Sequence, residues 1–250
     1  MSPAVISLIA FACVFGGALL GMLLRSALPE NHLGTDSKDV VKLGMGLVAS
    51  MAALVLSLLI ASAKGSFDTQ RDELVQMSSK VVLLDRVLSH YGAEAKEPRD
   101  LLGGAVAGMI ERTWPSDSSR SGQLEPTSGG ERLYDMVLTL TPQTDAQRSL
   151  QAEALSLVLD IGQTRWLLFE QRGSSISTPF LVVMVFWLTI LFTSFGLFAP
   201  CNGTVIATML VCALSVAGAV FLLLELDQPF GGFIRISSAP LRDALAHLGR

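Results

Sequence analysis

Four apolar segments without a charged residue constrain this chain more than any other feature. They cover residues 4–24, 43–63, 180–199 and 204–224, and none contains Asp, Glu, Lys, Arg or His. Each has about the 20 residues that an α-helix needs to cross the hydrocarbon core of a membrane. Because lipid cannot hydrogen-bond an open backbone, such segments cross as helices. The sequence therefore predicts four membrane-spanning helices.

The composition agrees with this class of protein. Of the 250 residues, 50% are hydrophobic and only 16% are charged, whereas soluble domains have about 25% charged residues. No basic residues precede the first segment, as they would in a cleaved signal peptide, so we expect it to remain a membrane helix. Nucleic-acid binding depends on a positively charged surface. The net charge of this chain is −4, so no nucleic-acid partner is expected.

The apolar segments divide the chain into four regions. We expect a first transmembrane hairpin over 1–64, a helical domain over 65–177 with a mobile loop at 115–130, a second transmembrane hairpin over 178–224 and a tail over 225–250. The second hairpin is antiparallel because only residues 200–203 join its helices. The predicted fold class is all-α, with a helical domain inserted between the second and third spans.

Basic residues predict the orientation of the chain in the membrane. Four crossings place both termini and the inserted domain on one side, and that side carries most of the basic residues. The opposite side has only those of the first loop, Arg25, Lys38 and Lys42. Lys64 and Arg172 lie close to helix ends, where basic residues set the orientation. We therefore expect cytoplasmic termini and a cytoplasmic inserted domain.

Apolar residues of the inserted domain recur at spacings of three and four, which predicts helices. The first helix runs to Tyr91, and its apolar seam consists of Leu74, Met77, Val81, Leu84, Leu88 and Tyr91. This seam either packs against other helices of the same chain or contacts another subunit. Further helices are predicted over 99–112 and from Thr144 to about Glu170, and no alternating strand pattern occurs.

The chain lacks the residue patterns of common enzymes and coupled transporters. Its spans have no ionisable group, which ion-coupled carriers and intramembrane enzymes usually bury for function. No nucleotide-binding or nucleophile motif occurs. Asp85 and His90 are interpreted as part of a solvated helix face. Cys13, Cys201 and Cys212 form no metal-binding pattern. We therefore expect no catalytic residues, no metal, no cofactor and no enzymatic activity.

The second span carries two kinds of surface. Small residues recur every three or four positions, at Gly46, Ala49, Ser50, Ala53, Ser57 and Ala61, and larger apolar residues fall largely on the other side. A stripe of small residues normally lets helix backbones approach closely. The alternative is that one of these faces lines a passive pore, which gates by dewetting if its constriction is apolar.

The stretch ELDQPFGG, residues 225–232, follows directly on the fourth span. One interpretation is a stop signal, in which Pro229 ends the helix, the glycines permit a sharp turn and the carboxylates lie in water. In the other, Glu225 and Asp227 accept hydrogen bonds or pair with Lys64 or Arg172 and hold the tail in place. In both interpretations this turn, which also contains Phe230 and Gly231, is a structural element and not a catalytic one.

Three stretches of the sequence resemble the bacterial bestrophin-like family, distant relatives of the bestrophin anion channels. They are GSFDTQRDELVQMSSKVVLLDRVLSHYG at 65–92, STPFLVVMVFWLTILFTSFGLFAP at 177–200 and LELDQPFGGFIRISSAPLRDAL at 224–245. The order of parts is also similar: two spans, a long helical insert, two more spans and a Pro-Phe-Gly turn. To the characterised channels, the resemblance rests on topology and the turn at 228–231 alone.

The resemblance implies a homopentamer in the bacterial inner membrane, with the second span of each subunit around a central axis. The implied pore-lining candidates are Leu47, Ser50, Met51, Leu54, Val55, Ser57 and Leu58. Channel bestrophins narrow their neck with bulky side chains, including aromatic ones, and this span has no aromatic residue. The acidic run that holds calcium in animal bestrophins is replaced here by Gly-Phe-Ile-Arg, so calcium gating is not expected.

Two functions are compatible with these features. The first is an oligomeric passive channel for small anions such as chloride, whose partners are the lipid bilayer, the anions and further copies of the chain. The second is a non-conducting membrane scaffold that uses its helical domain to bind a partner or itself.

Overall fold

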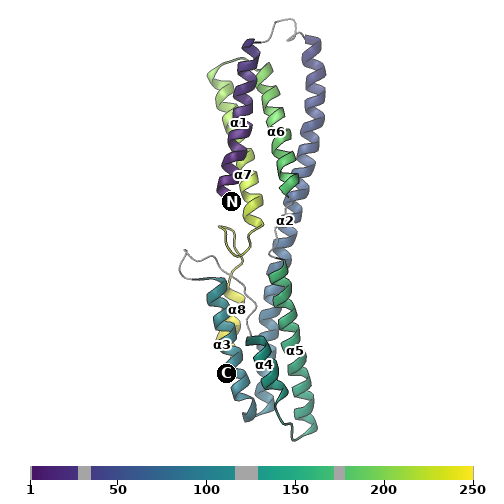
Figure 1. The fold of residues 1–250 in the computed structure, drawn as a ribbon, viewed down its shortest axis with the longest axis vertical. Helices are drawn as coiled ribbons and strands as arrows, with labels where there is room; N and C mark the ends of the chain where they lie inside the picture. Colours follow the sequence, from purple (N-terminus) through teal and green to yellow (C-terminus); the bar gives the residue numbers. More distant parts are fainter. Residues whose placement is uncertain (1, 28–34, 116–128, 172–177, 250) are drawn as a thin grey trace. The chain divides into compact units, whose positions relative to one another are not determined.

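The computed structural model of the chain describes residues 2–27, 35–115, 129–171 and 178–249, and these residues are helical nearly throughout. The predicted all-α class is confirmed, since no strand occurs in the described ranges. The elements are α1 (Pro3–Ala27), α2 (Thr35–Tyr91), the 3-10 turn η2 (Ala93–Ala95), α3 (Lys96–Thr113), α4 (Gly129–Leu138), α5 (Asp145–Glu170), α6 (Thr178–Phe198), α7 (Gly203–Leu226) and α8 (Ala239–His247) (Figure 1). The predicted loop at 115–130 falls mainly on residues 116–128, outside the described residues.

Four of the described helices, α1, α2, α6 and α7, are long and apolar enough to cross a membrane. They contain the four charge-free segments. The second segment and the apolar seam that follows it form one continuous helix of 57 residues. No proline interrupts this stretch, so every residue keeps the backbone N–H that the helix needs. The helix ends before Gly92, whose φ of 128° is a conformation that glycine adopts readily.

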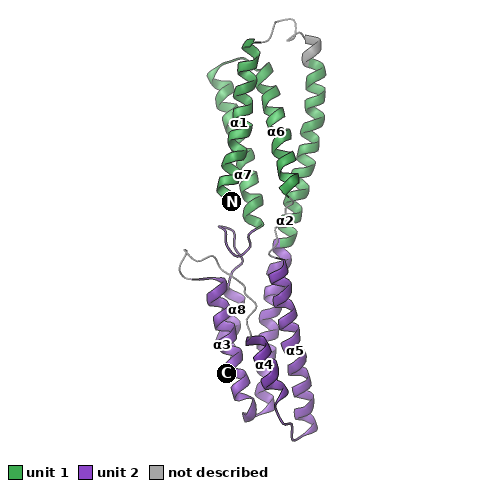
Figure 2. Cartoon of the chain, viewed as in Figure 1, with its two compact units in different colours: residues 1–66, 174–227 green, residues 67–173, 228–250 purple. Residues whose placement is uncertain are grey.

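The chain forms two compact units (Figure 2). Unit 1 consists of residues 1–66 and 174–227, and unit 2 consists of residues 67–173 and 228–250. The helix α2 supplies residues to both units. Unit 1 thus holds all four charge-free segments, whereas unit 2 holds most of the charged residues.

In unit 1, α1 packs against both α6 and α7 (Figure 1). Buried Val14 and Ala18 of α1 contact Phe192 of α6 and Ala213 of α7 in one apolar cluster. A second cluster joins Ala10 of α1 to α6 and α7, and includes Ala63 at the end of the apolar part of α2. Asn202 caps α7, because its side chain accepts a hydrogen bond from the backbone N–H of Val205 at 2.9 Å.

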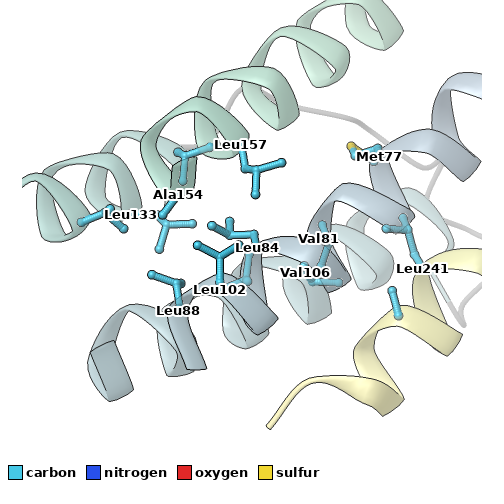
Figure 3. Packing of buried hydrophobic residues seen from close by; sticks show 14 of the residues in the cluster. Met77, Val81, Leu84, Leu88, Leu102, Val106, Leu133, Ala154, Leu157 and Leu241 are labelled. Carbon is cyan, nitrogen blue, oxygen red and sulfur yellow. The ribbon is translucent and has the colours of Figure 1, made fainter. Parts of the chain in front are cut away.

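In unit 2, the apolar seam of α2 forms the core. All six seam residues are at most 3% exposed, and they pack against α3, α4, α5 and α8 (Figure 3). Met77, Val81, Leu84 and Leu88 face Leu102 and Val106 of α3, Leu133 of α4, Ala154 and Leu157 of α5, and Leu241 of α8. Of the two interpretations of the seam, packing within the chain is therefore confirmed.

Helix ends in unit 2 are held by side-chain hydrogen bonds from α5. Thr144 caps the start of α5 by accepting from the backbone N–H of Gln147 at 3.1 Å. Gln147 Nε2 donates to the carbonyl oxygen of Tyr91, at the end of α2, at 3.0 Å. Gln151 Nε2 donates to the carbonyl oxygens of Val137 and Leu140 at 2.9 and 2.8 Å. The Thr144 bond satisfies a backbone N–H at the start of α5, and the two glutamines satisfy carbonyls at and just after the ends of α2 and α4, which those helices cannot satisfy themselves.

Candidate functional site

The apolar part of α2 is the least covered of the long apolar helices. Only 11% of its most apolar stretch is buried inside the chain, against 39% in α1, 28% in α6 and 17% in α7. Its buried or half-buried residues lie on one face, at Met45, Val48, Ala52, Val55, Leu56, Leu59 and Ala63. The other faces of this stretch are exposed in a single chain.

Six of the seven pore-lining candidates lie on these exposed faces. Leu47, Leu54 and Leu58 are between 65% and 72% exposed, Met51 is 43% exposed, and Ser50 and Ser57 are exposed as well. Val55 is the exception, because it is half-buried beside Ala52 and Leu59 on the packing face. Val55 would therefore affect a pore only indirectly, through the neighbouring residues against which it packs.

The face of α2 that points away from the rest of unit 1 carries Ser50, Leu54, Ser57 and Ala61. Successive residues of an α-helix are rotated by roughly 100°, so these residues lie opposite Val48, Ala52 and Leu59 of the packing face. Leu47 and Leu58 flank the exposed face on one side, and Gly46 and Ala53 flank it on the other. Ser50 and Ser57 donate to the carbonyl oxygens of Gly46 and Ala53 at 2.9 and 2.8 Å, and each keeps an oxygen lone pair on the exposed face.

The residues of the ELDQPFGG stretch divide between the two units. Glu225, in the last turn of α7, is only 4% exposed, so for this carboxylate the interpretation as a solvated group is wrong. Asp227 is the C-cap residue of α7 and is half-buried. Pro229 and Phe230 are buried and Gly231 is exposed, all in unit 2. Gly231 does not adopt a positive φ, so the turn does not depend on the conformational freedom of this glycine.

Phe230 is held by an aromatic contact that the sequence did not reveal. Its ring lies edge-on to that of Trp114, the C-cap residue of α3, with ring centroids 5.8 Å apart. Trp114 Nε1 donates to the carbonyl oxygen of Ile236 at 2.8 Å, and the Ile236 N–H donates to the carbonyl oxygen of Pro229 at 2.7 Å. The Pro-Phe-Gly turn thus closes a short loop that is anchored on α3, which is a structural role.

Asp85 does not belong to a solvated face, contrary to the prediction from sequence. It is 3% exposed, and both its oxygens accept hydrogen bonds from Arg99 of α3, at 2.7 and 3.0 Å. This charged hydrogen bond raises the pKa of the Arg99 guanidinium. The backbone N–H of Gly249 also donates to Asp85 at 3.3 Å. The spacing between Asp85 and His90 could not predict the Asp85–Arg99 ion pair, because Arg99 comes from the next helix, α3.

A close contact between α1 and α6 was missed in the sequence. Gly17 and Gly21 are four residues apart on α1, a spacing typical of closely packed membrane helices. A Cβ atom at Gly17 would lie 2.8 Å from Thr193 Oγ1, and one at Gly21 would overlap the carbonyl oxygen of Thr193. On α6, a Cβ atom at Gly196 would overlap the carbonyl oxygen of Ala18. Only hydrogen atoms fit at these three positions.

The described residues contain no group of three or more His, Cys, Asp or Glu side chains that could hold a metal ion. Hydroxyl groups in the described parts of the spans, among them Thr189, Thr193 and Ser215, donate to carbonyl oxygens one turn earlier in the same helix. These spans therefore present small dipoles and apolar side chains.

Four long apolar helices, one with most of its surface uncovered, define a helical membrane protein. A comparison with protein-family models matches residues 12–241 to the bestrophin-like domain. The match covers most of the chain, and the chain belongs to the bestrophin-like family, as its sequence resemblance predicted. Comparisons with curated proteins and with solved structures gave no match.

Proposed function

We propose that this protein is an oligomeric passive channel for small anions such as chloride, with α2 of each subunit lining a central pore. The observation that supports this proposal is the exposure of α2: in a single chain, only one face of its apolar part is covered by other helices. Lipid can cover an apolar helix face. Small side chains bury little apolar area against lipid, however, so a stripe of them fits a closely packed neighbouring helix or a pore better.

The arrangement of faces supports one placement of α2 in the assembly. The residues that pack within the subunit point outward from the axis, so the opposite face, with Ser50, Leu54, Ser57 and Ala61, points toward it. The residues that flank this face, Leu47 and Leu58 on one side and Gly46 and Ala53 on the other, would then pack against α2 of the neighbouring subunits. The homopentamer remains an implication of the family resemblance.

The chemistry of this stripe fits passive conduction. The spans carry no ionisable group that could couple an anion to protons or another ion. The two serine hydroxyls offer weak polar contacts to a partly hydrated anion, and the absence of aromatic residues from residues 43–63 leaves the neck wide. We further propose a multi-pass protein of the bacterial inner membrane, with cytoplasmic termini and unit 2 in the cytoplasm, and no enzymatic activity.

The proposal is tested by chloride efflux from liposomes that contain the purified full-length protein. We expect efflux above that of protein-free liposomes, and faster efflux after Met51→Ala or Val55→Ala, which remove bulk at or behind the pore face. No efflux from the wild type and from both widened variants would remove the channel function and leave a membrane scaffold. A native mass that does not correspond to five subunits would contradict the pentamer independently.

A further inference from the structure

Unit 2 contains a cavity of about 910 Å³ that has no part in the proposed function. Five helices line it, namely α2, α3, α4, α5 and α8. Its floor is made by residues of the apolar core, among them Met77, Val81 and Leu241 (Figure 3). A volume of this size between the helices of a bundle is typical of a site for one small molecule.

The walls of the cavity are mainly apolar and include three aromatic rings. Trp166 and Phe169 of α5 meet edge to face, with ring centroids 5.7 Å apart, and Tyr134 of α4 supplies the third ring. Met77 and Met109 add thioether groups, which make favourable contacts with aromatic rings. Because aromatic rings attract one another in edge-to-face and offset geometries, a ring of a bound molecule would have several favourable neighbours.

Large apolar side chains on the walls remain uncovered in the chain alone. Trp166 is 58% exposed, and Leu159, two turns earlier on the same helix, is 52% exposed. Gly104 of α3 and Gly162 of α5 also line the cavity, and a Cβ atom at either would meet no other atom within 4 Å. The side chains of this unit therefore leave the space unfilled, and an apolar molecule would cover surface that otherwise contacts water.

The charged residues of the lining favour a neutral molecule. Two arginines and two carboxylates balance one another, namely Arg112, Arg165, Glu131 and Asp135. Both arginines already interact with other groups of the chain. Both carboxylates are exposed, so water screens their charges. A charged molecule would lose hydration on entering this cavity and would gain no net attraction in return.

We propose that this cavity binds a neutral aromatic molecule, with its rings against Trp166 and Leu159 and above the floor at Met77. Stacking, sulfur contacts and the burial of apolar surface favour such a molecule. The half-buried Tyr134 offers a hydroxyl group to a polar substituent. This site lies within unit 2 and does not depend on anion conduction through α2.

The test uses the full-length protein in lipid nanodiscs and three probes that share a naphthalene ring system and differ in charge. Isothermal titration calorimetry measures the binding of neutral 2-naphthamide, anionic 2-naphthoate and cationic 2-naphthylmethylammonium. Empty nanodiscs are the blank, because partition of a probe into lipid does not saturate and occurs in both samples.

We expect saturable binding of 2-naphthamide to the wild type, about tenfold or more tighter than binding of either charged probe. No saturable binding of the amide would overturn the proposal. Binding of a charged probe as tight as that of the amide would also overturn it, because the lining would then select for charge or select for nothing.

Two leucines of α5 form a matched pair that locates the bound probe. Leu159 lines the cavity and is 52% exposed, whereas Leu167 is 51% exposed on the same helix and does not line it. Neither truncation removes a core residue, so both variants are expected to fold. We expect Leu159→Ala to weaken amide binding by about fivefold and Leu167→Ala to leave it unchanged. Equal affinities of these two variants would contradict the assigned site.

A second matched pair fills space instead of removing it. Gly162→Leu places a side chain in the open space of the cavity, whereas Gly103→Leu places one on α3 outside the lining. A Cβ atom at either glycine meets no other atom within 4 Å, and leucine favours a helix more than glycine does. We expect Gly162→Leu to weaken amide binding by about tenfold or more and Gly103→Leu to leave it unchanged. Amide binding that survives Gly162→Leu unchanged would show that the probe binds elsewhere and would overturn the proposal.

Discussion

Tyr91 buries a polar group at the end of α2 without an evident benefit. Its side chain is 3% exposed, and its hydroxyl has no hydrogen-bond partner among the described residues. Burying a hydroxyl in this way costs about 1–3 kcal/mol. We therefore predict that Tyr91→Phe leaves the thermal stability at neutral pH unchanged or raises it by a few degrees, as measured by circular dichroism in detergent.

The same residue predicts a dependence of stability on pH. Burial, and then the charge of Glu94, raise the pKa of Tyr91 above 10.0 in the folded protein. The unfolded chain then loses this proton at a lower pH than the folded chain does, so stability falls as pH rises above about 10. We predict that the melting temperature falls less between about pH 9 and pH 11 in Tyr91→Phe than in the wild type. Parallel curves for the two proteins would contradict this.

Two ion pairs of unit 2, Asp85–Arg99 and Lys80–Asp160, differ in burial and should differ in their effect on stability. Asp85 pairs with Arg99 in the core, whereas Lys80 pairs with Asp160 at 3.0 Å with both side chains about one-third to one-half exposed. Removing one member of a buried pair strands a charge, and we predict that Asp85→Asn costs about 2 kcal/mol or more. Asp160→Asn, the matched control, should cost less than about 1 kcal/mol.

A double variant separates the two contributions of the buried pair. Asp85→Leu combined with Arg99→Met removes both charges, and we expect it to recover most of the stability that Asp85→Asn loses. If the double variant is as unstable as the single one in thermal unfolding, packing and not charge compensation explains the role of Asp85.

At the scale of helices, the α1–α6 contact is the tightest feature of unit 1. Gly21→Ala would drive a methyl group into the backbone of α6 at Thr193, and helices packed at backbone contact can only separate in response. We predict a loss of about 1–3 kcal/mol, typical of overpacking, seen as a lower melting temperature. Gly16→Ala is the matched control, because a Cβ atom there meets no other atom within 4 Å. Equal melting temperatures of the two variants would contradict the close contact.

Local signals in the sequence predicted most helices, because each depends on neighbouring residues. The Thr144 cap predicted the start of α5, the apolar seam predicted the lower part of α2, and the charge-free segments predicted four long apolar helices. Contacts between helices were not predictable in the same way. The position of Arg99 opposite Asp85, the ring of Trp114 on Phe230 and the glycine contact of α1 with α6 all depend on how separate helices pack.

At the scale of the whole molecule, the sequence directed attention to α2, the least covered of the long apolar helices, but did not distinguish its faces. The candidate set combined Ser50, Leu54 and Ser57, which share the face that points away from the rest of unit 1, with Leu58 on the flank of that face and Val55 on the packing face. The side of α2 that can face a pore axis is the side that is not buried within the subunit. Which residues of α2 are buried depends on how it packs with α1, α6 and α7. The cavity of unit 2 was also beyond sequence patterns, because five helices build it.

The most direct test of the account is chloride efflux from liposomes that contain Ser57→Phe or Ser215→Phe. Both serines are exposed and bond to their own helix, but Ser57 lies on the face of α2 that points away from the rest of unit 1, and Ser215 lies on α7. We predict that the wild type and Ser215→Phe conduct alike and that Ser57→Phe lowers efflux by about tenfold or more, because a phenyl ring from each subunit would narrow the proposed pore. Equal efflux through both variants, or no efflux through the wild type, would contradict a pore lined by α2.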